Sequence, residues 1–308
     1  MKRLVLIDGN ALIHRAYHAI PKTFTNSRGE PTNAVYGFAS MFLKVITSLK
    51  PDYLAVAFDM KGPTFRHEEY EGYKEGRPEM EEALVSQLPK VRRLAQGFDV
   101  PTFEAPGFEG EDVIASLNRQ AGEQHPELET VIVTGDMDLL QLVDKDTRIY
   151  APKKGLSQPI LYDEGKVQEK YGLKPEQVVD FKALRGDPSD RIPGVLGIGE
   201  KGAGELLRTF GTLEEVYRNL SKIRPAVAEK LGAGKESAFL SQKLARIVDT
   251  APVELDLEKC RFREVDKVAA AGVLKDFGFR SLAKRILGEA AVETKKEVVN
   301  KDQMSLSL

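Results

Sequence analysis

Three short apolar segments, each followed closely by an aspartate, constrain the fold of this chain most strongly. They are residues 3–7, 53–58 and 130–133. Such continuous runs, rich in branched aliphatic residues, are typical of strands buried on both faces of a parallel sheet. Helix-compatible stretches separate them, which predicts an open, mostly parallel α/β sheet with flanking helices. Ligands bind beyond the carboxyl ends of such strands, where Asp8, Asp59 and Asp136 fall.

The length of 308 residues predicts about two domains. We place an α/β core at residues 1–174 and a helical region at 175–288, where Pro175 opens a section rich in helix formers and glycines. Residues 289–308 lack helical periodicity and are predicted to be a flexible tail. Pro78, followed by Glu79, Glu81 and Glu82, predicts the start of a helix that is disturbed around Pro89.

The composition excludes several classes of protein. No run of 18 apolar residues is present, so we expect no membrane span. The apolar run before Asp8, residues 4–7, has only four residues, too few for a signal peptide, and we predict a cytoplasmic protein. The single cysteine, Cys260, excludes an internal disulfide and a thiolate metal site. The net charge of −2 does not indicate nucleic-acid binding, unless a cluster of metal-bound acids masks a basic surface.

Nine carboxylates recur where an α/β sheet would gather them. They are Asp8, Asp59, Glu109, Glu111, Asp112, Asp136, Asp138, Asp187 and Asp190. So many acids in one pocket would repel one another unless cations neutralise them, and oxygen ligands alone favour Mg²⁺ or Mn²⁺. Any one of them could instead cap a helix or form a turn, and Glu111 with Asp112 could complement a helix dipole. Their recurrence in separate segments favours the metal site.

The motifs that carry these acids resemble a known family. The ordered set is DGNALIHRAY, AFD, FRHEEYEGYKEGRP, GFEGEDVIASL, VTGDMDLLQLV and GDPSDRIPGVLGIGEKGAGELL. It resembles the 5′-nuclease domain at the N-terminus of bacterial DNA polymerase I, within the flap-endonuclease superfamily, over residues 3–285. The resemblance implies a PIN-like fold and a stand-alone 5′-3′ exonuclease and flap endonuclease. Such an enzyme removes 5′ flaps and RNA primers in replication and repair, leaving a 5′-phosphate and a 3′-hydroxyl.

The resemblance also assigns the acids to two metal ions, Mg²⁺ or Mn²⁺. The first group matches Asp8, Asp59, Glu109, Glu111 and Asp112, and the second matches Asp136, Asp138, Asp187 and Asp190. Two positions depart from the family pattern. Glu111 stands where the family usually has aspartate, so it reaches one methylene further. Arg191 stands where the family usually has asparagine, which adds a cation beside a metal ligand.

Basic and aromatic residues are the predicted contacts with DNA. Lys74 and Arg77 match basic residues of the family's helical arch, here about 61–97, and are expected to contact the scissile phosphate; a solvated charged face is the alternative. The further predicted contacts are Tyr17, Phe65, Arg66, Tyr73, Arg191, Gly197, Gly199 and Lys201. The last four lie in a stretch of about 185–210 that matches a helix-hairpin-helix variant, which would bind duplex phosphates and K⁺.

The end of the sequence resembles a docking motif for the bacterial β sliding clamp, with Gln303, Met304, Leu306 and Leu308 as its anchors. The predicted partners are therefore this clamp and DNA with 5′ flaps or RNA primers, and the protein is predicted to be a monomer. The alternative function is a DNA-junction-binding protein without catalysis. A phosphatase or small ribonuclease is disfavoured, because Asp8-Gly9-Asn10 lacks an Asp-x-Asp nucleophile pattern and neither would need the hairpin.

Overall fold

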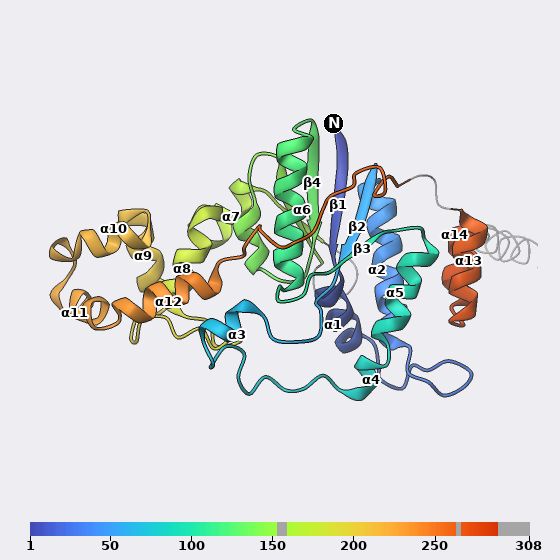
Figure 1. Ribbon diagram of the computed structural model, residues 1–308, viewed down its shortest axis with the longest axis horizontal. Coiled ribbons are helices and arrows are strands. Elements are labelled where there is room, and N and C mark those ends of the chain that lie inside the picture. Colours follow the sequence, from blue (N-terminus) through green and yellow to red (C-terminus); the bar gives the residue numbers. More distant parts are fainter. Residues whose placement is uncertain (153–158, 263–265, 289–308) are drawn as a thin grey trace, which may run out of the picture. The chain divides into compact units, whose positions relative to one another are not determined.

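The computed structural model describes residues 1–152, 159–262 and 266–288 of the chain (Figure 1). Six strands form one sheet in the order β3-β2-β1-β4-β5-β6. The strands are β1 (Lys2–Asp8), β2 (Tyr53–Ala57), β3 (Thr102–Phe103), β4 (Leu128–Val133), β5 (Thr147–Ala151) and β6 (Ile160–Tyr162). β1 pairs with β4 and β4 with β5 in parallel, whereas β6 runs antiparallel to β5. The predicted mostly parallel α/β sheet is confirmed.

The chain divides into two compact units that interleave along the sequence. The first comprises Met1–Ala11, Ala57–Glu79 and Phe103–Asp256, and the second comprises Leu12–Val56, Met80–Thr102 and the residues from Leu257 onward. In the first unit, α6 (Gly110–Gln124) packs on β1 and β4. The apolar runs of β1 and β4 are buried along nearly their whole length, which accounts for their uninterrupted hydrophobicity.

The first unit also holds a group of helices that lie together in Figure 1. They are α7 (Glu164–Tyr171), α8 (Val178–Arg185), α9 (Glu200–Phe210), α10 (Leu213–Arg218), α11 (Pro225–Ala233) and α12 (Lys235–Ala245), with short 3₁₀ turns at Asp138–Leu142, Pro175–Gln177 and Leu220–Lys222. α8 packs against α9 and α12. A core of buried aliphatic residues that includes Leu184, Leu207 and Leu231 holds this group together. The predicted helical region after Pro175 is present.

The second unit contains α2 (Asn33–Leu49), α4 (Glu82–Val85), α5 (Leu88–Gly97), α13 (Lys267–Asp276) and α14 (Arg280–Leu287). α1 (Gly9–Ala19) begins in the first unit and continues into the second. α5 packs against α2 and α13, and Val91, Leu94 and Ala95 are fully buried on it. The last part of the predicted arch, residues 88–97, is therefore a packed helix.

Helix α4 starts at Glu82 rather than directly after Pro78. Glu81, the residue before α4, has an extended backbone, and its carboxylate accepts hydrogen bonds from Tyr17 Oη at 2.8 Å and Lys22 Nζ at 2.6 Å. These contacts hold Glu81 outside the helix. Pro89 is the second residue of α5, where its missing N–H breaks no helical hydrogen bond. No helix in the described part of the chain is long and apolar enough to span a membrane.

Candidate metal centre

Asp8 is the last residue of β1, and its carboxylate is held from both sides. Its Oδ1 accepts the Ala11 N–H at 2.9 Å, and its Oδ2 accepts the Thr134 hydroxyl at 2.7 Å. Burial raises the pKa of Asp8 to about 7, and the negative charges of Asp59 and Asp136 add to the effect. A bound cation would reverse this cost, because it favours the ionised carboxylate.

Asp59, just after β2, is fixed by two donors. Asn10 Nδ2 donates to its Oδ2 at 2.9 Å, and the Gly110 N–H donates to its Oδ1 at 2.6 Å. A Cβ atom on Gly110 would lie only 2.9 Å from the same oxygen. Glycine at this position therefore permits the close approach of Asp59 to the first turn of α6. Asn10 and Gly110 are positioning residues that the sequence analysis did not identify.

Glu111, Asp136 and Asp138 form the tightest group of acids. One oxygen from each lies within 4.8 Å of the others, and no other trio of His, Cys, Asp or Glu in the described ranges meets this condition. The Asp138 N–H donates to Asp136 Oδ1 at 2.9 Å, which ties the two aspartates together. Burial raises the pKa of Glu111 well above its usual range and also raises that of Asp138. This oxygen-only donor set fits a hard divalent cation such as Mg²⁺ or Mn²⁺.

Asp112 behaves differently from the other acids, because its carboxylate is fully buried and saturated by donors. Its Oδ1 accepts Arg66 Nη2 at 2.8 Å and the Val248 N–H at 3.0 Å. Its Oδ2 accepts Arg66 Nη1 at 2.8 Å and the Glu109 N–H at 3.0 Å. Its role as a metal ligand therefore stays a prediction. The carboxylate orients the first turn of α6, which carries Glu109 and Glu111.

Arg66, on the short helix α3 (Phe65–Glu69), is the centre of that contact. It is fully buried, and it also donates from Nε to Leu244 O at 3.0 Å and from Nη2 to Arg246 O at 2.9 Å. Its Nη2 lies 3.3 Å from Glu111 Oε1. The prediction that Arg66 contacts DNA conflicts with this burial. Arg66 joins α3, the start of α6 and the segment after α12.

Lys74 lies among the acids, as the family resemblance implies. Its Nζ donates to Glu109 Oε2 at 2.8 Å and lies 4.0 Å from Asp190 Oδ2, while its backbone N–H donates to Asp190 O at 3.0 Å. Burial opposes the charge on Lys74, but Glu109 and Asp190 outweigh it and raise the pKa of Lys74. Lys74 has a φ of 53°, a left-handed conformation that costs energy for a residue other than glycine.

Lys182 contacts two of the predicted metal ligands, and the sequence analysis did not identify it. It lies on α8, almost fully buried, and forms an ion pair with Asp138 and a second, 2.6 Å long, with Asp187. Burial alone would raise the pKa of Asp187, but hydrogen bonds from Lys182 and Ser189 lower it to about 2. The sequence offered only one indication of these contacts, a lysine between the apolar residues Phe181 and Ala183. The structure shows that this stretch of α8 is buried.

The other predicted DNA contacts near the arch differ in exposure. Arg77 is exposed, whereas Phe65 is half-buried, with its ring centroid 4.6 Å from the Arg66 guanidinium carbon. Tyr17 and Tyr73 are 1% and 3% exposed, and Tyr73 packs into an apolar cluster. Their burial conflicts with the prediction that Tyr17 and Tyr73 stack on unpaired bases.

The loop that carries Asp187 and Asp190 is closed by a two-residue antiparallel bridge between Asp187 and Ile192. Gly194, after this loop, has a φ of 64°, and a Cβ there would lie 2.3 Å from Gly186 N, so only glycine fits. Its N–H donates to Ser241 Oγ, and its carbonyl accepts from Ser237 Oγ, both on α12.

The connection that follows, residues 195–199, leads into α9, with Val195 and Ile198 buried and the residues between and after them exposed. Gly197, Gly199 and Lys201 are exposed, and Leu196 is 94% exposed. A Cβ added at Gly199 would meet no atom within 4 Å, so this position is open to a ligand. The exposed Arg191, with a φ of 55°, lies with its Nη1 3.4 Å from Glu75 Oε2. The predicted clamp anchors Gln303, Met304, Leu306 and Leu308 lie outside the described residues.

Comparison with known protein families agrees with this arrangement. Residues 3–172 match the 5′-3′ exonuclease N-terminal resolvase-like domain, and residues 173–268 match the 5′-3′ exonuclease C-terminal SAM fold. The chain is 46% identical over 286 residues to DNA polymerase I of Caldicellulosiruptor bescii and 37% identical over 297 residues to that of Bacillus subtilis. These alignments cover 92% and 96% of this chain but 33% of each relative, so the chain spans about a third of their length.

Solved structures share the fold. A flap endonuclease of bacteriophage T5, in a pseudo-enzyme-product complex with DNA and metal ions, superposes with a TM-score of 0.66 at 22% identity, over 94% of this chain and all of that chain. The catalytic core of Rad2 in complex with DNA substrate gives 0.57 at 17% identity, over 93% and 92% of the two chains. The protein described here belongs to the 5′-3′ exonuclease family.

Proposed function

We propose that this protein is a structure-specific 5′ nuclease that hydrolyses phosphodiesters at 5′ flaps and RNA primers with two divalent metal ions. The observation that carries the proposal is the group of Glu111, Asp136 and Asp138, whose oxygens lie within 4.8 Å of one another beside the protonation-prone Asp8. Arg66 and Lys182 compensate the charge of this group only in part, and a metal ion would supply the rest. Family membership and the DNA-bound T5 and Rad2 structures support the same conclusion.

The carboxylates would divide between the two ions as the family pattern implies, with one change. Asp8, Asp59, Glu109 and Glu111 would hold the first ion, and Asp136, Asp138, Asp187 and Asp190 the second, with Mg²⁺ or Mn²⁺ in both places. We assign Asp112 a positioning role instead, because it has no exposed surface and the buried Arg66 already balances its charge. Bound ions would activate a water, orient the phosphate and stabilise the leaving 3′ oxygen.

The cations of the site would serve different steps. Without metal, the Lys74 ammonium donates a hydrogen bond to Glu109. Once a metal ion neutralises that carboxylate, the ammonium can donate to a phosphate oxygen instead. The exposed Arg77 would contact the scissile phosphate, as the family pattern implies. Lys182 holds Asp138 and Asp187 together before the second ion binds.

The duplex beside the flap would rest on the connection around Gly197, Gly199 and Lys201, which we interpret as a helix-hairpin-helix variant. Exposed backbone amides at the start of α9 can approach a phosphate there, and Lys201 and Arg191 add positive charge. Binding would be independent of base sequence and sensitive to salt. We also propose K⁺ at the hairpin carbonyls, which predicts tighter duplex binding in K⁺ than in tetramethylammonium at equal ionic strength.

The test of the nuclease function is a set of matched DNA substrates labelled at the 5′ end. The protein should cleave a 5′-flap duplex in Mg²⁺ within a nucleotide or two of the junction and leave a 3′-hydroxyl on the released strand. A 3′-flap duplex of the same sequence is the control and should stay intact. The alternative, a non-catalytic junction-binding protein, would bind the 5′ flap in Ca²⁺ and release no product in Mg²⁺ or Mn²⁺.

We further propose that Gln303, Met304, Leu306 and Leu308 dock on a bacterial β sliding clamp. The support is the sequence alone: apolar residues alternate after a glutamine, as in an extended peptide that places anchors in a groove. A titration of clamp should give micromolar affinity for the full protein and none for a version truncated after Asn300. Equal affinities for the two, or none for either, would refute the docking.

A further inference from the structure

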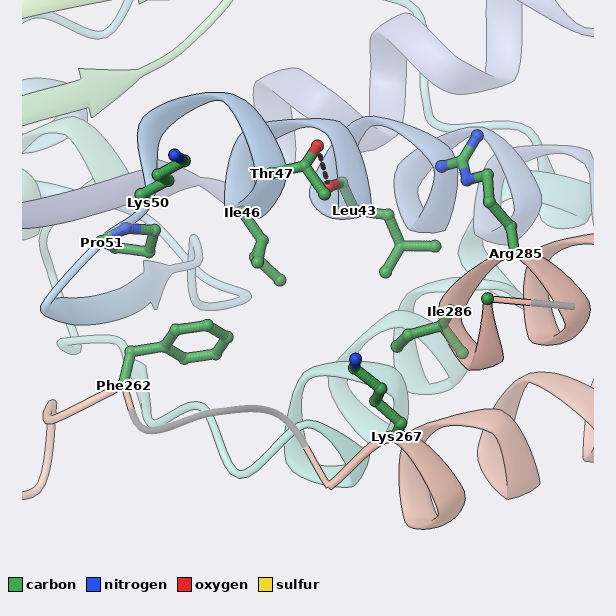
Figure 2. Close-up of a pocket in the computed structure, with 10 residues that line it drawn as sticks. Leu43, Ile46, Thr47, Lys50, Pro51, Phe262, Lys267, Arg285 and Ile286 are labelled. Carbon is green, nitrogen blue, oxygen red and sulfur yellow. Dashed lines mark hydrogen bonds between the residues drawn. The ribbon is translucent and has the colours of Figure 1, made fainter. Parts of the chain in front are cut away.

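The second unit contains an open groove with an apolar floor. Its chemistry differs from that of the acidic centre. It encloses about 540 Å³ and is lined by the C-terminal part of α2, by Pro51 and Phe262, and by the ends of α13 and α14. Figure 2 shows Leu43 and Ile46 of α2 facing the space from one side and Ile286 of α14 from another. An apolar surface of this kind is unfavourable in water unless something covers it.

Among the residues that the structure describes, the charged side chains that line the groove are all basic. They are Lys50, Lys267 and Arg285. None of the three has an ion-pair partner within the residues that the structure describes. Lys50 and Arg285 stand at the C-terminal ends of α2 and α14, where the helix dipoles favour a cation.

Lys267 is the exception among these cations, because it is the first residue of α13 and stands at the positive end of that helix dipole. The acid next to it, Asp266, is engaged as the N-cap and accepts the N–H groups of Val268 and Ala269. Lys267 points into the groove between Ile46 and Ile286 (Figure 2). An anion placed in the groove would therefore gain most from Lys267.

The chain itself supplies a segment with the matching chemistry at the rim. Gly288 lines the groove and has a φ of 80°, a left-handed cap that ends α14 and turns the chain. The next five residues are Glu289-Ala290-Ala291-Val292-Glu293, three small apolar residues between two acids. Because this segment is tethered at the rim, its effective concentration is in the millimolar range, far above that of a separate partner.

We propose that residues 289–293 bind in this groove, with Ala290, Ala291 and Val292 on the apolar floor and the flanking acids near the three rim cations. The groove then binds a segment of its own chain. Binding of residues 289–293 would fix the position on the second unit from which the rest of the predicted tail begins. This inference does not depend on the nuclease function, since its evidence and its test lie outside the acidic centre.

The test is the rate at which a thiol in the groove is labelled by a maleimide. Thr47 is exposed, lines the groove, and its hydroxyl only bonds back to its own helix, so Thr47→Cys is a mild change. We expect labelling of the full chain to be at least tenfold slower than labelling of a version ending at Gly288. The same protein without Thr47→Cys reports the background from the buried Cys260.

Charge reversal makes the test independent of truncation. Glu289→Lys with Glu293→Lys should speed labelling in the full chain to within twofold of the truncated version, and adding Lys267→Glu should restore at least fivefold protection. Lys295→Glu with Lys296→Glu is the matched control and should leave protection unchanged. Equal labelling of the full and truncated chains would overturn the proposal. So would protection that disappears on dilution, since that outcome assigns the groove to a second copy or a separate acidic partner.

Discussion

Removing Arg66 should destabilise the protein far more than removing an exposed arginine of the arch. The guanidinium makes two hydrogen bonds to Asp112 and one each to Leu244 O and Arg246 O, and none of its surface is exposed. In Arg66→Met these partners lose their donors, and Asp112 keeps only two backbone amides around a buried negative charge. The methionine replaces the stem but none of the hydrogen bonds.

The size of the effect follows from the burial. Breaking a buried ion pair by removing one partner costs about 3–5 kcal/mol. For a domain of 150–250 residues, about 2–4 °C of melting temperature corresponds to each kcal/mol, so we expect a fall of roughly 10 °C. Because the two side chains interact directly, Arg66→Met and Asp112→Asn should be non-additive, with a coupling of about 2 kcal/mol.

The assay is thermal unfolding followed by circular dichroism in EDTA, so that metal binding does not contribute. Arg77→Met is the matched control and should melt within about 2 °C of the parent, because Arg77 is exposed. If Arg66→Met melted like Arg77→Met and instead lost affinity for flap DNA, Arg66 would be a DNA contact after all. Additive effects in the double variant would equally refute the buried pair.

Three further predictions concern the metal centre and the duplex. Because burial raises the pKa of Asp8 to about 7, this carboxyl stays protonated in the metal-free folded state between about pH 4 and 7, where it is ionised in the unfolded chain. The stability that this proton contributes is lost as the pH rises through the window, so the melting temperature in EDTA should fall more steeply in the parent than in Asp8→Asn, and equal slopes would contradict this. Lys182→Met should lower the melting temperature in EDTA yet enlarge the increase caused by Mg²⁺, since it removes a cation that competes for Asp138 and Asp187; an unchanged Mg²⁺ effect would contradict this. Lys74→Ala should lower the single-turnover rate about tenfold or more with little change in duplex affinity, whereas Gly199→Val should do the reverse; identical defects would refute the division of roles.

The sheet and most of the acidic centre could be predicted from the sequence because their signals are local. Continuous apolar runs mark β1 and β4, and acids at the carboxyl ends of parallel strands must meet at one edge of the sheet. The match of several motifs in one order then indicated the family. The comparisons confirm that assignment.

The contacts of Arg66, Asp112 and Lys182 could not be predicted, because they depend on residues distant in the sequence. Arg66 lies in a charged stretch that looks exposed, and only the carbonyls of residues 244 and 246 make it a buried donor. Asp112 differs from Glu111 because α6 begins at Gly110, which turns the third helical residue back onto the Glu109 N–H. Composition and periodicity contain neither fact.

The most direct test of the central claim is single-turnover cleavage of a 5′-flap duplex in Mg²⁺ by the parent, Asp8→Asn and Asp163→Asn. Asp163 caps α7, and asparagine caps helices equally well, so this variant is the control. We predict that Asp8→Asn lowers the cleavage rate about a hundredfold or more while flap affinity in Ca²⁺ stays within about threefold, and that Asp163→Asn cleaves like the parent. Cleavage by Asp8→Asn within tenfold of the parent rate would contradict the assignment of this carboxylate cluster as the metal centre.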